Sequence, residues 1–287
     1  MASAVTASFP FAAALDVATL LRQAPLEALE NRILVSHVLG LSRIQLITQS
    51  ERIVSAAETA RLNDVFQQRL DGEPIAYIVG EREFFGLPLQ VSPAVLIPRP
   101  ETELLVELAL ERLPPGASLL DMGTGSGAIA VAIAHQRPDA AVTALDVSDA
   151  ALQIARANAL RHAPGVSFLR SDWYAALNDA GHQRFAVIAS NPPYIVAGDR
   201  HLAEGDLRFE PVDALTDHDD GLSALRIIIA GAADHLLPGG WLLLEHGYDQ
   251  AAAVRALLDA HGFDAVQSWR DLASIERASG GHLKSAG

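Results

Sequence analysis

The sequence predicts an α/β protein in which a parallel sheet follows a small all-helical region. Between residues 118 and 245, short apolar runs alternate with helical segments, a pattern typical of βαβ units. A glycine-rich segment joins the first apolar run to the first of these helices, as in nucleotide-binding sheets. Half of the 287 residues are apolar, enough for the core of one large or two modest domains.

The first region is predicted to be helical up to about residue 72. Pro25 begins a helical stretch that ends at Leu39, where Gly40 follows as a stop signal. Ser55 and Glu58 have the spacing of a capping box, and apolar residues follow at helical spacing as far as Gly72. We expect a helical N-terminal domain over residues 1–74.

Short β-like runs broken by glycine and proline occupy residues 75–98. This pattern predicts a hairpin that connects two domains. Pro100 then begins a helix that runs to Leu113, with Glu101 and Glu103 in its first turn, where the helix dipole favours acidic side chains. The second domain is expected to cover residues 99–287.

The alternating pattern of the second domain predicts where its helices and strands lie. Helices are expected to begin at Gly127, Ser148 and Leu222. Strands are expected at residues 118–120, 141–145, 166–169, 185–189 and 241–244.

Composition excludes several classes of function. The chain has no cysteine, so disulfides and thiolate metal sites are ruled out, and its ten histidines show no metal-ligand spacing. The net charge is −14 and the basic residues form no run, which disfavours naked nucleic acid as a partner. Neither a signal peptide nor a bilayer-spanning apolar stretch is evident, so we expect a cytoplasmic protein without a membrane partner.

The glycine-rich segment is the first candidate site. Gly123, Thr124, Gly125, Ser126 and Gly127 lie between a predicted strand and a predicted helix, where glycines let the backbone approach a ligand. The Gly-x-Gly-x-Gly spacing differs from the dinucleotide pattern by one residue, which weakens a pyrophosphate interpretation. A plain structural turn is the alternative.

Two further residues are expected at the same edge of the sheet. Asp146 ends the second strand, 19 residues after Gly127, where a carboxylate accepts hydrogen bonds from ribose hydroxyls. Its alternative role is a cap on the next helix. Trp173 follows the third strand with Asp172, and its ring is a candidate contact for an adenine, although packing explains it equally well.

The segment Asn191-Pro192-Pro193-Tyr194 directly follows the fourth strand. Two prolines after a strand-end asparagine make a rigid turn whose carbonyls stay free of ladder bonding. We expect the Asn191 side-chain oxygen and the Pro192 carbonyl to accept the two N–H groups of a planar amide or amine, while Tyr194 stacks on it. Positioning of the nitrogen lone pair then supplies most of the catalysis. A proline-stiffened loop is the alternative.

These motifs resemble the class I S-adenosylmethionine methyltransferases, and closely the release-factor glutamine methyltransferases of the PrmC/HemK family. The resemblance covers most of the chain and includes the glycine segment, residues 171–173 and residues 191–194. It also includes residues 82–87, 96–103, 205–211 and 243–247, of which Ile97-Pro98-Arg99-Pro100-x-Thr102-Glu103 and Arg208-Phe209-Glu210-Pro211 look particular to this family.

The resemblance implies a Rossmann-like class I methyltransferase sheet and S-adenosylmethionine as the methyl donor. The implied acceptor is the side-chain amide nitrogen of the glutamine in the Gly-Gly-Gln motif of class I peptide chain release factors. It implies that residues 123–127, Asp146, Trp173 and Asn191 bind the cofactor, that residues 191–194 bind the glutamine, and that the helical domain docks the release factor. No metal is implied, and a monomer is expected. The C-terminal residues depart from the family ending, which puts the last strand in doubt.

Three other functions fit part of the sequence. A nucleic-acid methyltransferase acting on adenine or guanine amino groups would use the same segment with a flipped base, but the acidic charge speaks against it. An NAD-dependent oxidoreductase would use the glycine segment and Asp146 but leaves Asn191 unexplained. A non-catalytic cofactor-binding module would not need Asn191. The segment around Arg208 and Phe209 is either a lid or an ordered surface loop.

Overall fold

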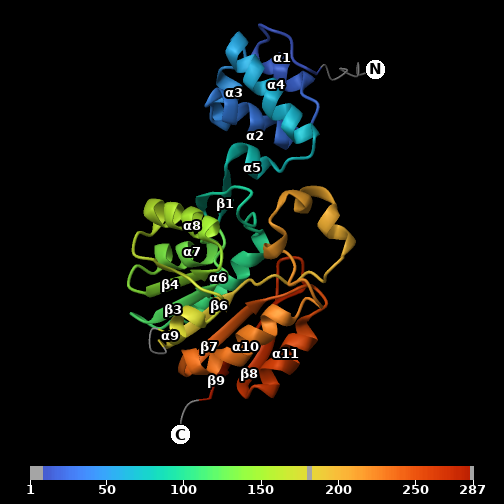
Figure 1. Ribbon diagram of the computed structural model, residues 1–287. Coiled ribbons are helices and arrows are strands. Elements are labelled where there is room, and N and C mark those ends of the chain that lie inside the picture. The colour runs from blue at the N-terminus through green and yellow to red at the C-terminus, as the bar shows by residue number, and fades with distance from the viewer. Residues whose placement is uncertain (1–8, 180–182, 285–287) are drawn as a thin grey trace. The chain divides into compact units, whose positions relative to one another are not determined.

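The computed structural model describes residues 9–179 and 183–284. Contacts divide the chain into two compact units, Met1–Gly80 and Glu81–Gly287 (Figure 1). The N-terminal unit is helical among its described residues, and the C-terminal unit contains the sheet. The predicted α/β fold with a helical N-terminal region is confirmed.

Five helices form the described part of the N-terminal unit: α1 (Val17–Gln23), α2 (Ala28–Leu39), α3 (Arg43–Thr48), α4 (Ala56–Leu70) and α5 (Ile75–Val79). The predicted capping box is present at the start of α4, where the Ser55 side chain accepts from the Glu58 backbone. Gly40 ends α2 with a left-handed φ of 64°, as predicted. Leu20, Leu34 and Phe66 are fully buried in a core of their own.

The hairpin prediction for residues 75–98 is right in its centre and wrong at its start. Strands β1 (Glu81–Phe84) and β2 (Leu87–Gln90) pair antiparallel as a hairpin. Residues 75–79, expected as a β-like run, instead form the helix α5, which Gly80 ends at a φ of 78°. A five-residue apolar run has the same pattern in a buried helix and in a strand, so periodicity does not separate the two.

A seven-stranded sheet organises the second unit, in the order β5-β4-β3-β6-β7-β9-β8. The pairs among the first five of these strands are parallel, and β9 is antiparallel to both neighbours. The strands are β3 (Ser118–Met122), β4 (Ala141–Asp146), β5 (Ser167–Arg170), β6 (Phe185–Ser190), β7 (Leu236–Glu245), β8 (Phe263–Arg270) and β9 (Glu276–Leu283).

Helices cover both faces of this sheet (Figure 1). One face carries α6 (Glu103–Arg112), α7 (Ala128–Gln136) and α8 (Asp149–His162) around a core that includes Leu105 and Ile133. The other face carries α9 (Ala175–Asp179), α10 (Ser223–His235) and α11 (Ala251–Ala260) around a core that includes Ile228 and Val254. The sheet is therefore buried between two apolar layers, as parallel sheets require.

The last strand, which the unfamiliar C-terminal residues put in doubt, is present. β9 pairs with β7 and β8 along its length. Gly280 allows this pairing, because a Cβ atom there would lie 2.3 Å from the Leu242 carbonyl oxygen. The predicted strand at 241–244 also begins earlier than expected, at Leu236.

Buried Asn158 fixes the hairpin and the glycine-rich segment to α8. Its Nδ2 donates to the carbonyls of Ser126, at 2.8 Å, and Gln90, at 2.9 Å. Its Oδ1 accepts from the Gln90 backbone N–H at 2.7 Å. In the part of the chain that the structure describes, no helix is long and apolar enough to cross a membrane.

Candidate active site at the carboxyl edge of the sheet

The three glycines of the loop between β3 and α7 differ in what they do. All three have left-handed φ angles, of 70° at Gly123, 55° at Gly125 and 83° at Gly127. A Cβ atom on Gly127 would lie 3.1 Å from the Ala155 Cβ, so this glycine lets α7 pack against α8. A Cβ atom on Gly123 or Gly125 would meet no atom within 4 Å. These two positions leave open space at the strand end, which fits an approaching ligand.

Asp146, at the end of β4, holds the glycine loop through its carboxylate. Oδ2 accepts from the Gly125 backbone N–H at 2.9 Å, and Oδ1 accepts from the Ser148 backbone N–H, also at 2.9 Å. Burial raises the pKa of Asp146, although these backbone donors oppose the rise. A carboxylate has about four acceptor sites, so it has room for ligand hydroxyls as well.

Asp121, in β3, lies beneath the same loop and was missed by the sequence analysis. Its Oδ2 accepts from the Thr124 hydroxyl at 2.6 Å and from the Ala130 backbone N–H at 3.1 Å. Its Oδ1 is buried without a hydrogen-bond partner among the described residues. Burial raises the pKa of Asp121 to about 7. An acidic residue inside an apolar strand run is the signal that identifies it.

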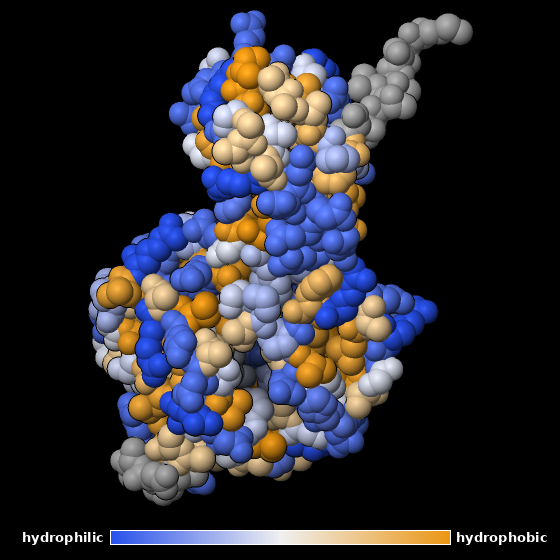
Figure 2. Space-filling view, turned by 45° about the horizontal axis from the view of Figure 1, so that its top comes forward, coloured by the Kyte–Doolittle hydropathy of each residue, from blue (hydrophilic) through white to orange (hydrophobic). Residues whose placement is uncertain are grey.

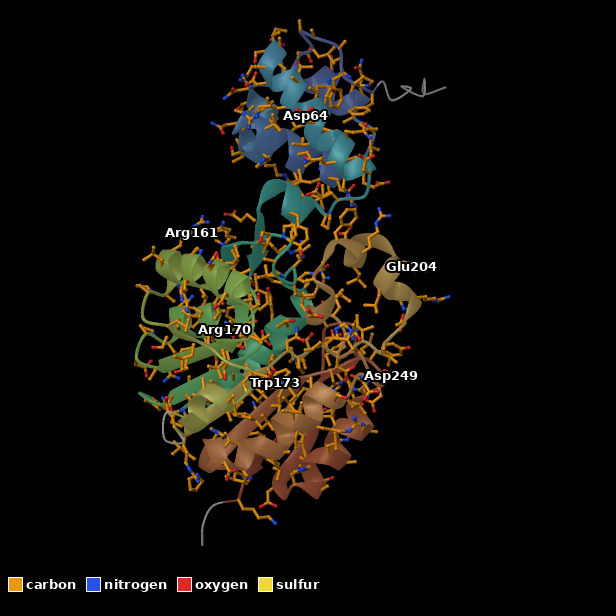
Figure 3. The ribbon with its side chains drawn as sticks, viewed as in Figure 1. Asp64, Arg161, Arg170, Trp173, Glu204 and Asp249 are labelled. Carbon is orange, nitrogen blue, oxygen red and sulfur yellow. The ribbon has the colours of Figure 1, made fainter. Side chains whose placement is uncertain are left out.

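Trp173 lies just after β5 and is labelled in Figure 3. Its φ of 46° is left-handed, and the Ser171 hydroxyl donates to its carbonyl at 2.6 Å. The half-buried ring packs against the core on the α10 face of the sheet. Part of its role is therefore packing, and its contact with a ligand stays a prediction. Asp172 beside it is exposed.

Asn191 lies beside the glycine loop because their strands are neighbours in register. Met122 is paired with Ser190, and the Ser190 hydroxyl donates to the Met122 carbonyl at 2.7 Å. Gly123 and Asn191 directly follow the paired ends of β3 and β6. The Asn191 Nδ2 donates to the Thr102 hydroxyl at 3.2 Å. Within residues 9–179 and 183–284, no hydrogen bond reaches the Asn191 Oδ1 or the Pro192 carbonyl, so both acceptors are available.

Tyr194 is held at both its hydroxyl and its backbone. The hydroxyl donates to Glu245 Oε1 at 3.3 Å, and the Gln250 side chain donates to the Tyr194 carbonyl at 3.0 Å. Burial, with the Glu245 charge, raises the pKa of Tyr194 well above its usual range, so the hydroxyl stays protonated. Pro192 is buried, whereas Pro193 and Tyr194 are partly exposed. The contact of Glu245 with this segment was not predicted from the sequence.

The two segments that look particular to the family meet through Glu210. This buried side chain forms an ion pair with Arg99 and accepts from the Ile97 backbone N–H at 3.0 Å. It belongs to the long segment after β6, in which Glu204 is labelled in Figure 3. Three short 3-10 helices order that segment: η2 (Arg200–Ala203), η3 (Gly205–Phe209) and η4 (Val212–Ala214). The segment is thus an ordered loop attached to the residues before α6.

The donor set of the site is suited to an organic ligand. Among the described residues, no group of three or more histidines and acidic residues has the arrangement of a metal site. One edge of the parallel sheet instead carries open glycine positions, a strand-end carboxylate and free carbonyl acceptors. This is the edge at which α/β folds bind nucleosides. The mostly parallel sheet, with helices on both faces and these residues at its carboxyl edge, has the class I methyltransferase fold.

Comparisons with known proteins agree with this class and narrow it. The family model described as "PrmC N-terminal domain" matches residues 14–80, and "Methyltransferase small domain" matches residues 100–205. The chain is 60% identical over 274 residues to a "Release factor glutamine methyltransferase" of Burkholderia pseudomallei, covering 93% of this chain and 95% of the relative. It is 53% identical to the protein of that name from Bordetella pertussis, covering 92% of this chain and 98% of the relative. The chain belongs to the release factor glutamine methyltransferase family.

A solved structure supports the fold alone. The crystal structure of a methyltransferase from Pyrococcus furiosus aligns with a TM-score of 0.52 at 22% identity, covering 77% of this chain and 98% of that one. These relatives together confirm the predicted family and the predicted methyltransferase class.

Proposed function

We propose that the carboxyl edge of the sheet holds the acceptor amide between Asn191 and Pro192, beside the cofactor bound at the glycine loop. As a member of its family, the chain methylates glutamine in a release factor from S-adenosylmethionine. Within the release factor, the proposed acceptor atom is the side-chain nitrogen of the glutamine in the Gly-Gly-Gln motif of class I release factors. The register of β3 and β6, which places Gly123 next to Asn191, carries this proposal.

The residues of the glycine loop fit the methyl donor. Thr124 and Ser126 are buried, and the turn they form leaves the space at Gly123 and Gly125 open. Asp146 accepts ribose hydroxyls with the lone pairs that its backbone donors leave free. Trp173 flanks the adenine from the end of β5. When bound, S-adenosylmethionine supplies a methyl group made electrophilic by the positive charge on sulfur.

Asn191 and Pro192 act on the acceptor nitrogen. An amide nitrogen is a weak nucleophile because its lone pair is delocalised into the carbonyl group. When the Asn191 Oδ1 and the Pro192 carbonyl accept its two N–H groups, the lone pair is directed away from the protein acceptors and toward the donor. Pro193 keeps this turn rigid, and the Tyr194 ring stacks on the planar group. Fixed acceptors of this kind lower the barrier mainly by positioning.

The helical unit is proposed to dock the release factor. Its described surface exposes Leu29, Ile44 and Ile47 at 66%, 73% and 71%. Figure 2 shows hydrophobic and hydrophilic residues interspersed on this unit. A hollow in it is lined by apolar and basic side chains that include Leu29, Arg32, Ile33, Arg43 and Leu46. Mixed surfaces with apolar centres are typical of protein interfaces.

The partners proposed for the chain are proteins only. The net charge of −14 disfavours binding to the phosphate backbone of a nucleic acid. We propose that the protein is a monomer. We also propose that it is cytoplasmic, because a chain without cysteine fits a reducing compartment. Domain roles are proposed as docking by residues 1–74, connection by 75–98 and catalysis by 99–287.

Substitution of Asn191 by alanine tests the proposed acceptor site. We expect Asn191→Ala to lower kcat at least about tenfold, because a hydrogen bond made in the transition state is lost. Calorimetry should show that cofactor affinity is largely kept. The matched control is Gln267→Ala, which removes an exposed amide on β8. Parent-like turnover by Asn191→Ala would overturn the assignment.

A further inference from the structure

Gln250, at the start of α11, joins three separate turns of the backbone. Its side-chain Nε2 donates to the Tyr194 carbonyl at 3.0 Å and to the Gly221 carbonyl at 3.2 Å. Its Oε1 accepts from the Gly247 backbone N–H at 2.8 Å. Asp249, the residue before it, is labelled in Figure 3. One side chain therefore connects the end of the 191–194 segment with the turns before α10 and after β7.

These three partners fix the Gln250 amide in one orientation. A backbone N–H only donates and a carbonyl oxygen only accepts. The Gly247 N–H must therefore face the amide oxygen, and the carbonyls of Tyr194 and Gly221 must face the NH₂ group. A flipped amide would lose all three hydrogen bonds and would place its oxygen against two other acceptors. The donor end of Gln250 is thus directed at the Tyr194 carbonyl by the backbone around it.

Gly221 shows how closely these turns approach one another. Its φ of 78° is left-handed, and a Cβ atom there would lie 2.4 Å from the Tyr194 carbonyl oxygen and 2.8 Å from Nε2 of Gln250. Glycine suits this position because it adopts the left-handed conformation and leaves the space free. The Tyr194 backbone is therefore packed directly against a turn that Gln250 also holds.

The long segment between Tyr194 and Gly221 is closed at its base by these contacts. Ile195 and Thr216 form a parallel bridge that joins the two arms of the segment to each other. Gln250 attaches both arms to the turn after β7. The end of the proposed acceptor site is thus fixed to the sheet through one amide.

Tyr194 is held at two points by neighbouring parts of the chain. Its hydroxyl donates to Oε1 of Glu245, the last residue of β7, at 3.3 Å, whereas its carbonyl accepts from Gln250. The first contact restrains the ring, and the second restrains the backbone that carries it. Pro192 and Pro193 precede this carbonyl and have fixed φ angles. A displacement of the Tyr194 backbone is therefore passed on to the Pro192 carbonyl.

We propose that Gln250 is a positioning residue that holds the Tyr194 backbone, and with it the Pro192 carbonyl, in place for methyl transfer. This inference rests on the proposed role of residues 191–194 as the acceptor site. Gln250 acts through Tyr194 and does not need to touch the substrate. Acceptors that work by positioning must be held within about 0.5 Å of the productive geometry.

The test compares Gln250→Met with Gln250→Glu in the full-length chain, with an unmodified release factor and S-adenosylmethionine. Methionine keeps the length of the side chain but removes all three hydrogen bonds. Glutamate keeps an acceptor for the Gly247 N–H but replaces the donor to Tyr194 with a second acceptor. We expect both variants to lower kcat about 10- to 100-fold, because a small displacement of a positioned group has an effect of this size. The Kd for S-adenosylmethionine should stay close to parental.

Calorimetry separates positioning from loss of folded protein. The number of cofactor molecules bound per chain counts the folded sites, and it should be parental in both variants while kcat falls. A merely structural role predicts instead that kcat falls only as far as this stoichiometry falls. If Gln250→Met does not fold, Gln250→Glu carries the test, because it keeps the Gly247 contact at the start of α11.

Arg137→Met is the matched control. The Arg137 side chain pairs with Asp139 and, like Gln250, donates to two backbone carbonyls, those of Leu113 at 2.8 Å and Pro114 at 3.1 Å. Arg137 precedes β4, and these two carbonyls precede the parallel strand β3, so the contacts lie at the opposite edge of the sheet from the site. We expect this variant to be less stable than the parent but to keep its kcat.

The outcomes separate this inference from the proposed function. Parental kcat in both Gln250 variants, or a loss of kcat that only follows the cofactor stoichiometry, would overturn the positioning role. Parental kcat in Gln250→Glu alone would also overturn it, because the Gly247 contact would then suffice. If Asn191→Ala loses turnover while Gln250→Met keeps it, the acceptor site stands and only the inference fails. If Asn191→Ala keeps turnover, the acceptor site itself is wrong.

Discussion

The backbone N–H of Gly125 donates a hydrogen bond to Oδ2 of Asp146 at 2.9 Å. This contact joins the glycine loop after β3 to the end of the neighbouring strand β4. The carboxylate proposed to accept the ribose hydroxyls therefore also holds the loop that is proposed to surround the rest of the cofactor.

Replacement of Asp146 should weaken cofactor binding more than it weakens folding. We expect Asp146→Ala to raise the Kd for S-adenosylmethionine about 10- to 100-fold, since hydrogen bonds to a charged group contribute about 1.5–3 kcal/mol. Titration calorimetry measures the change. Asp149→Ala, an exposed aspartate at the start of α8, is the control and should bind normally. Equal affinities of the two variants would show that Asp146 does not contact the ligand.

Substitutions of different loop glycines should affect different properties, either stability or cofactor binding. Gly127→Ala is expected to lower the free energy of unfolding by about 1–3 kcal/mol, because the new Cβ is strained at its φ of 83° and crowds Ala155. Gly125→Ala should carry the φ strain without this crowding and should weaken cofactor binding by filling open space. Gly116→Ala, also at a left-handed φ with nothing within 4 Å, is the control for strain alone. Denaturant unfolding and calorimetry together measure the three variants. Normal binding by Gly125→Ala would contradict the open-site interpretation.

Local patterns predicted most of the sheet and the position of the site. Each parallel strand except the early part of β7 was predicted near its observed bounds, because an apolar run followed by a turn signal is local information. The last two strands, β8 and β9, were not assigned, and α5 was taken as part of a β-like region. Short or half-exposed segments form helices or strands according to the residues that pack against them in the folded chain. Gly280 is an example, because its lack of a side chain allows β9 to lie against β7.

The positions of the proposed site residues were predicted where a single turn after a strand determines them. Gly125, Asp146 and Asn191 all lie at the expected edge. Glu245 and Thr102 were missed because their contacts with Tyr194 and Asn191 join residues far apart in the sequence. Asp121 was missed although an acidic residue in an apolar strand run is a local signal. The Tyr194 to Glu245 bond, for example, spans 51 residues. Spacing along the chain carries no signal for such a contact.

The ion pair between Arg99 and Glu210 should stabilise the long segment after β6. Arg99→Ala leaves the Glu210 carboxylate buried with only the Ile97 backbone donor, so we expect a loss of about 1–3 kcal/mol in the free energy of unfolding. Limited proteolysis should also cut residues 199–214 faster. Arg226→Ala breaks a half-exposed pair with Asp220 and should cost about 0–1 kcal/mol. Equal losses in the two variants would contradict a special role for the buried pair.

Asp121 should make stability depend on pH. Its pKa of about 7 in the folded chain lies above the unfolded value of about 3.9. The folded state therefore binds an extra proton between these values, and stability falls as pH rises through that window, by up to about 1.4 kcal/mol per pH unit. Asp121→Asn should reduce this slope between pH 5 and 7, and Glu245 and Asp146, whose pKa values burial also raises, contribute to the slope that remains.

Urea unfolding at several pH values measures this effect. Asp139→Asn is the control, because hydrogen bonds from Arg137 and Gly116 lower the pKa of Asp139 and its contribution is lost only in more acidic solution. The slope between pH 5 and 7 should be unchanged in that variant. An unchanged slope in Asp121→Asn would show that Asp121 is charged in the folded chain at these pH values.

Mass spectrometry of an unmodified release factor, incubated with this chain and S-adenosylmethionine, locates the methylated atom. We expect one added methyl group on the side-chain nitrogen of the Gly-Gly-Gln glutamine, and its absence when Asn191→Ala replaces the parent. A methyl group at another residue, or equal methylation by parent and variant, would contradict it.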